Sequence, residues 1–147
     1  MRTLAIDLGS RRVGLAVSDE GGTFATPYDV LFVSSEEAAV DPILKVVARE
    51  GIERLVVGLP LNMDDSVGPQ ARKVIEWGNG LSKRVAKPVL FVDERLSSFD
   101  AEQTLIERKR SGEHITRNQK KKQLDAMAAA GFLQAFLDGK LRSIEAT

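Results

Sequence analysis

Three carboxylates stand where separate parts of the chain could bring them together: Asp7, Glu94 and Asp125. Asp7 lies inside an apolar stretch, Glu94 follows another, and Asp125 adjoins the apolar positions of the last long segment. Magnesium takes oxygen ligands in near-octahedral geometry and keeps several waters. Two such ions roughly 3.5–4 Å apart can activate water and stabilise the leaving oxygen of a phosphodiester. Carboxylates converging from separate elements would therefore suit metal-dependent phosphodiester hydrolysis.

Each carboxylate also has a plainer interpretation. Asp7 could accept hydrogen bonds from the turn after its strand, and Glu94 could lie in a solvated turn paired with Arg95. Asp125 could pair with neighbouring lysines at helical spacing. Taken singly, Asp7 fits a metal ligand and a turn acceptor equally well, whereas Asp125 more readily fits a surface ion pair. Hydrolysis is the stronger interpretation only for the three together.

The elements that must position these residues can be read from hydrophobic periodicity. Leu4, Ile6 and Leu8 alternate onto one face of a strand, which places Asp7 on the opposite face. Similar patterns predict five strands, over residues 4–8, 13–17, 26–33, 54–58 and 89–92. Helical spacing predicts four helices, over residues 40–47 with an end at Gly51, over 71–85, from Ser97 or Ser98 to about 110, and over 124–136.

The order β-β-β-α-β-α-β-α-α predicts an α/β fold in a single domain, residues 1–147. A meander followed by βα alternation implies a mixed five-stranded sheet, with three antiparallel strands, then parallel strands, and helices on both faces. Ligand groups in such sheets lie at the carboxyl ends of the parallel strands. Glu94, at the exit of the fifth strand, is at such a place.

Several polar residues could support this chemistry by binding phosphate or shaping loops: Arg12, Asn62, Arg95 and Ser97. A turn donor, a loop cap, a surface ion pair and a helix cap are the respective alternatives. The formal net charge is zero, but Arg108–Lys122 holds seven Lys or Arg residues against one Glu. Such a segment could hold a nucleic-acid backbone, with Arg117, Lys121 and Lys122 as candidates, or could simply be a solvated loop and helix start.

Composition excludes other chemistry. The chain has no cysteine and one histidine, so disulfides, zinc sites and Ser-His or Cys-His catalysis are disfavoured. No apolar run is long enough for a membrane span, and the N-terminus does not resemble a signal peptide. We therefore expect a cytoplasmic protein. Trp77 and the phenylalanines mostly fall on apolar stripes, which predicts core positions rather than base-stacking platforms.

Four ordered motifs, spanning nearly the whole chain, resemble the YqgF/RuvX family of pre-16S rRNA nucleases, also called Holliday junction resolvases: Asp7–Gly14 (D-x-G-x-x-R-x-G), Val57–Asp64, Val92–Ser98 and Lys122–Ala129. The resemblance implies a ribonuclease H-like fold and maturation of the 5′ end of pre-16S rRNA. It implies Asp7, Glu94 and Asp125 as catalytic ligands of Mg²⁺, with Mn²⁺ as a substitute. One departure is Asp65, where the family usually has glycine, and it concerns the loop more than activity.

Three functions compete on this basis. The first is a nuclease, with RNA favoured as substrate and branched DNA, as for a Holliday junction resolvase, as the alternative. The second is a non-catalytic RNA-binding factor in ribosome assembly. The third is a phosphotransferase of the actin-like class, which needs a second such domain that this chain has no room for. The sequence leaves open whether the protein forms a homodimer.

Overall fold

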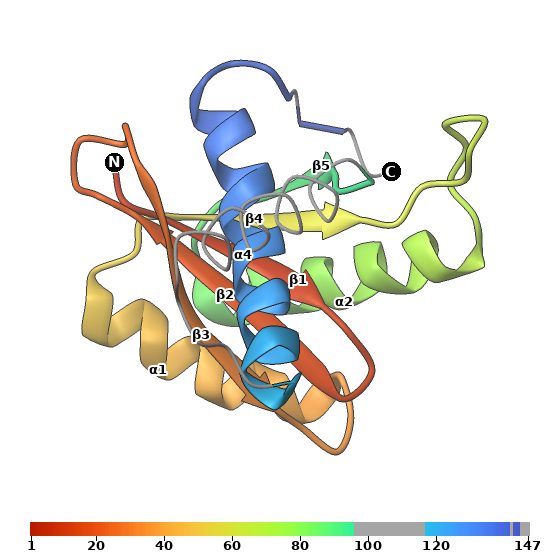
Figure 1. Ribbon diagram of the computed structural model, residues 1–147, viewed down its shortest axis with the longest axis horizontal. Coiled ribbons are helices and arrows are strands. Elements are labelled where there is room, and N and C mark those ends of the chain that lie inside the picture. Colours follow the sequence, from red (N-terminus) through yellow and green to blue (C-terminus); the bar gives the residue numbers. More distant parts are fainter. Residues whose placement is uncertain (96–116, 142, 145–147) are drawn as a thin grey trace.

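The computed structural model describes residues 1–95, 117–141 and 143–144, and for residues 117–123 it describes the backbone alone (Figure 1). The elements are, in chain order, β1 (Thr3–Leu8), β2 (Arg12–Ser18), β3 (Ala25–Phe32), the 3-10 helix η1 (Glu37–Ala39), α1 (Val40–Glu50), β4 (Arg54–Leu59), α2 (Pro69–Val85), β5 (Val89–Asp93) and α4 (Arg117–Leu137).

The five strands form one mixed sheet in the order β3-β2-β1-β4-β5. Strand β2 pairs antiparallel with both β1 and β3, whereas β4 runs parallel to both β1 and β5. The short turns of the N-terminal meander allow only antiparallel neighbours, and the helical crossovers α1 and α2 return the chain to parallel strands. The predicted mixed five-stranded sheet is confirmed.

Helices cover both faces of this sheet, as predicted. Leu4 and Ile6 lie in a buried cluster with residues of α1 and α2. Ala5, one position along β1, lies in a second cluster that contains Ala129 and Phe132 of α4. Strand alternation therefore turns Asp7, which has the parity of Ala5, toward the α4 face. Figure 1 shows α4 crossing the sheet on that side.

The strands and helices expected within the described residues are present, and they differ from expectation mainly in the residues at which they begin and end. Helix η1 was not expected, and the helix predicted from Ser97 or Ser98 to about residue 110 lies outside the described residues. Helix α2 runs unbroken through both of its glycines. No helix among the described residues is long and apolar enough to cross a membrane.

The core prediction was wrong for two phenylalanines. Phe24 and Phe32 are 67% and 68% exposed, just before the start and at the end of β3. Strand β3 is an edge strand, and Val30 inside it is buried on the side of α4.

Candidate active site

Three elements bring the predicted carboxylates to one end of the sheet on the α4 face. Asp7 comes from β1, Asp125 from α4, and Glu94 directly follows β5. The backbone N–H of Glu94 donates to the carbonyl oxygen of Leu59 at 3.3 Å, which continues the parallel ladder one residue beyond β5. Because Asp93 and Glu94 alternate, Glu94 turns toward Asp7 while Asp93 turns toward Arg95. The structure therefore juxtaposes all three predicted residues.

Two glycines make room for this arrangement. Gly14 of β2 stands directly opposite Asp7, and a Cβ there would lie 2.1 Å from the backbone oxygen of Asp125. A Cβ on Gly58 of β4 would lie 2.6 Å from Oε2 of Glu94. Contacts this short are impossible for a real side chain, so glycine at both positions lets α4 and Glu94 approach Asp7. Sequence reasoning missed these roles, although glycine inside a strand is a known signal of close approach.

Asp7 and Glu94 share a hydrogen bond between their side chains. Burial, then the negative charge of Asp7, raises the pKa of Glu94 to about 9. Burial also raises the pKa of Asp7, while the hydrogen bond from Glu94 opposes that rise. Ionising both of two neighbouring carboxylates has a high free-energy cost in a site that is largely shielded from water. At neutral pH Glu94 therefore keeps its proton and donates it to Asp7.

Asp125 is held differently. Its Oδ2 lies 3.3 Å from Nε of Arg12, at the start of β2. Burial raises the pKa of Asp125, and the charge of Arg12 offsets part of that effect. Oδ2 is nevertheless a buried atom without a hydrogen bond to any described residue. It is thus a carboxylate oxygen with unused coordinating capacity, because a buried acceptor ordinarily finds a donor.

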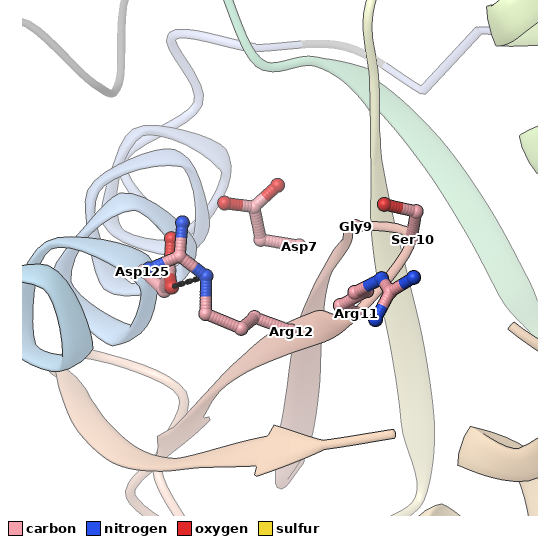
Figure 2. A pocket seen from close by; sticks show the side chains of 6 residues that line it. All are labelled: Asp7, Gly9, Ser10, Arg11, Arg12 and Asp125. Atoms are coloured by element: carbon pink, nitrogen blue, oxygen red, sulfur yellow. Dashed lines mark ion pairs between the residues drawn. The ribbon is translucent and has the colours of Figure 1, made fainter. Parts of the chain in front are cut away.

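A pocket of about 450 Å³ opens beside these groups, lined by Asp7, Gly9, Ser10, Arg11, Arg12 and Asp125. Figure 2 shows Asp7 and Asp125 near one another, Arg12 reaching Asp125, and Ser10 and Arg11 on the other side. The turn between β1 and β2 is closed by the N–H of Gly9, which donates to the carbonyl oxygen of Arg12 at 3.0 Å. A pocket with both carboxylates and guanidinium groups suits a phosphate accompanied by a cation. Sequence reasoning did not select Ser10 or Arg11.

The fit to a divalent cation rests on the donor set. In the parts of the chain that the structure describes, no group of three or more His, Cys, Asp or Glu is arranged to hold a metal ion as it stands. Asp7 and Glu94 instead share a hydrogen bond, and Oδ2 of Asp125 has an ion pair with Arg12 but no hydrogen bond to a described residue. All of these are hard oxygen donors of the kind that Mg²⁺ and Mn²⁺ take. A cation that replaced the shared proton would offset both the burial and the mutual repulsion that raise the pKa of Glu94.

Arg95 and Asn62, predicted to contact nucleic acid, lie in a network within the protein. Arg95 donates from Nε and Nη2 to Asp93, from Nη2 also to Asp65, and from Nη1 to the carbonyl oxygen of Asn62. The Asn62 side chain donates to Oγ of Ser66 at 3.0 Å. These bonds tie the loop after β4 to the end of β5. In this structure Arg95 fixes the loop, and its contact with nucleic acid stays a prediction.

Four further candidates are not placed. Ser97 lies outside the described residues, as do the side chains of Arg117, Lys121 and Lys122. The backbone of the last three forms the first turns of α4, ahead of Asp125. Their proposed contacts with phosphate therefore stay predictions.

Comparison with known proteins finds matches along nearly the whole chain. The family model described as "RuvX: Holliday junction resolvase" matches residues 1–139. A protein of Caldanaerobacter subterraneus subsp. tengcongensis named "Putative pre-16S rRNA nuclease" is 39% identical over 143 residues, covering 97% of this chain and 100% of its own length. One of Thermosynechococcus vestitus with the same name is 35% identical, covering 98% and 92%.

Solved structures show the same fold. Thermus thermophilus RuvC, in a complex with a Holliday junction substrate, superposes with a TM-score of 0.58 at 20% identity, covering 98% of this chain and 100% of RuvC. The Fowlpox virus resolvase, in a complex with Holliday junction DNA, gives 0.57 at 10% identity, covering 95% and 98%. The ribonuclease H-like fold of these resolvases is therefore confirmed for this chain.

Proposed function

Because this chain belongs to the RuvX family of nucleases, we propose that it is a metal-dependent endonuclease that matures the 5′ end of pre-16S rRNA in the cytoplasm. The observation that supports the chemistry is that Asp7 and Asp125 line a pocket together with Arg11 and Arg12, while Glu94 shares a hydrogen bond with Asp7. The names of the relatives support the choice of substrate.

The roles of the residues follow from their surroundings. Asp7, Glu94 and Asp125 would hold Mg²⁺, and Mn²⁺ could replace it. When bound, the cation supplies Lewis-acid activation of the phosphodiester and of the attacking water. Arg11 is exposed at the pocket and offers a guanidinium to the phosphate. Arg12 positions Asp125 through their ion pair and also neutralises it in the absence of a cation.

A cleavage assay tests the proposal directly. Precursor 16S rRNA and a four-way DNA junction are incubated with the protein in Mg²⁺ or Mn²⁺, beside the Asp7→Asn variant. We expect cleavage of the RNA by the parent and a loss of at least about 100-fold in the variant, since a developing charge loses its preorganised stabilisation. Asp138→Asn is the matched control, because Asp138 is exposed at the far end of α4. It should cleave like the parent, and full activity of Asp7→Asn would refute the proposal.

A second candidate, resolution of branched DNA, is favoured by the description of the family model and by the fold shared with RuvC. The same assay separates the two, since a resolvase would cut the four-way junction in preference to the RNA. RNA binding without cleavage in either metal would instead indicate a non-catalytic ribosome-assembly factor.

A further inference from the structure

An exposed aromatic ring stands beside the candidate active site. Phe32 is the last residue of β3 and is directly opposite Arg12, the first residue of β2, in the antiparallel ladder. Opposite residues in such a ladder share a face, and their Cβ atoms are about 4.5–5.5 Å apart. Arg12 lines the pocket and reaches Asp125. Phe32 therefore flanks the pocket on the α4 face of the sheet.

The exposure of this ring is not explained by packing. Val30 has the same parity in β3 and is 4% exposed, whereas Phe32 is 68% exposed. A large apolar side chain left in water next to a charged pocket forgoes the stabilisation of burial, on the order of 2–3 kcal/mol. Phe24 has nearly the same exposure, but it precedes the other end of β3, beside the turn formed by Asp19 and Thr23. The two rings thus differ in their distance from the pocket rather than in their exposure.

Charge complementarity identifies the occupant. The pocket sets the guanidinium groups of Arg11 and Arg12 beside the carboxylates of Asp7 and Asp125, a combination that suits a phosphate accompanied by a cation. The ring of Phe32 lies next to Arg12 on the same face. A phosphate bound by these guanidinium groups would carry a nucleobase beside it. Aromatic rings bind bases by stacking, and only an unpaired, unstacked base has a free face to offer. A continuous duplex would not meet this requirement.

We propose that Phe32 is a stacking platform for an unpaired nucleobase next to the phosphate bound at Arg11 and Arg12. This inference rests on the proposed nuclease function and deepens it. It makes the substrate class a single-stranded segment, loop or end at the cleavage position. The pocket lies at the turn between β1 and β2, and the ring lies at the neighbouring end of β3. The two therefore form one surface for a nucleic-acid strand.

The test measures binding without cleavage, in an Asp7→Asn background and by fluorescence anisotropy. The probes are a single-stranded RNA of about 12 nucleotides, within the usual site size of such surfaces, and a blunt duplex of the same sequence. Phe32→Ala should weaken single-strand binding about 5- to 100-fold, the effect of losing one stacked base. The salt dependence should not change, because no phosphate contact is removed.

Phe24→Ala is the matched control, since it removes an equally exposed ring from the other end of the same strand. It should bind the single strand like its parent, and Phe32→Trp should retain affinity. In a Trp77→Phe background the new indole of Phe32→Trp should be quenched by the single strand and not by the duplex. Because Phe24 and Phe32 are exposed, we expect the substitutions at these two positions to keep the thermal melting profile of the background into which they are introduced.

Four results would overturn the inference. Unchanged affinity of Phe32→Ala, with the parent binding normally, refutes stacking while leaving the nuclease proposal intact. Equal losses in Phe32→Ala and Phe24→Ala show a general surface effect. A concentration-dependent dimer that Phe32→Ala abolishes, with RNA binding unchanged, shows that a second copy of the chain covers the ring. Failure of the parent to bind any nucleic acid refutes the nuclease proposal as well.

Discussion

The Asp7–Glu94 pair determines how the free energy of unfolding depends on pH. Burial and the charge of Asp7 raise the pKa of Glu94 from its ordinary value of 4.5 to about 9. The folded state therefore binds a proton that the unfolded state has released between these two values. Stability from this group is complete below about pH 4.5 and is lost as the pH rises toward about 9. A group that we propose as a ligand of the catalytic cation thus weakens the fold at neutral and alkaline pH.

Glu94→Gln should remove this loss, because the amide donates to Asp7 as the protonated acid does and cannot ionise. We expect urea unfolding at about pH 8.5 to show the variant more stable by several kcal/mol, because folding of the parent must take up a proton that the unfolded chain has released, at a cost of up to about 1.4 kcal/mol for each pH unit above the ordinary pKa. At about pH 5 the two proteins should be nearly equal. Glu37→Gln, in an exposed part of η1, should follow the parent throughout. A parallel pH dependence for Glu94→Gln and the parent would contradict the shared proton.

At the scale of elements, local pattern predicted most of the architecture. Most strands and helices in the described residues lie within a few positions of their expected bounds, because periods of 2 and 3.6 depend only on neighbouring residues; α4 is the exception and begins at Arg117 rather than at residue 124. The contacts that shape the site are long-range. Gly14 meets the backbone of Asp125, and Arg95 reaches Asp65, so neither role is visible in a local window.

The approach of α4 to β2 yields a prediction at this scale. A Cβ at Gly14 would lie 2.1 Å from the oxygen and 2.5 Å from the carbon of the Asp125 carbonyl, and backbone atoms cannot rotate away. Gly14→Ala must therefore push the helix off the sheet, which should cost about 1–3 kcal/mol of stability. Displacing a catalytic group by about 1 Å should also lower cleavage about 100-fold. Calorimetry and the cleavage assay measure the two effects.

Gly80→Ala is the control for this substitution. Gly80 lies inside α2, and a Cβ there would have no neighbour within 4 Å. Alanine is the better helix former, so this variant should be more stable than the parent by about 0.5–1 kcal/mol and fully active. If Gly14→Ala matched Gly80→Ala in both measurements, the close approach would not constrain the site.

At the scale of the whole molecule, the two faces of the sheet do different work. The cluster under α1 and α2 contains most of the large buried aliphatic side chains. The cluster under α4 is rich in alanine, including Ala5, Ala16 and Ala129, so the helix lies close to the strands. Close packing there brings Asp125 to Asp7, at the cost of gathering carboxylates in a partly buried place. The first face can thus stabilise the fold, while the second positions the residues of the candidate site.

This division predicts that divalent metal stabilises the whole molecule through one site. A ligand that binds only the folded state, at about ten times its Kd, adds about 1.4 kcal/mol to the free energy of unfolding. For a chain of this size we expect Mg²⁺ to raise the Tm by about 3–6 °C. Because the cation competes with the proton held by Asp7 and Glu94, the gain should be larger at about pH 8.5 than at about pH 6. The gain should vanish in Asp7→Asn and persist in Asp138→Asn. An equal rise in Tm for Asp7→Asn would place the stabilising metal elsewhere on the protein.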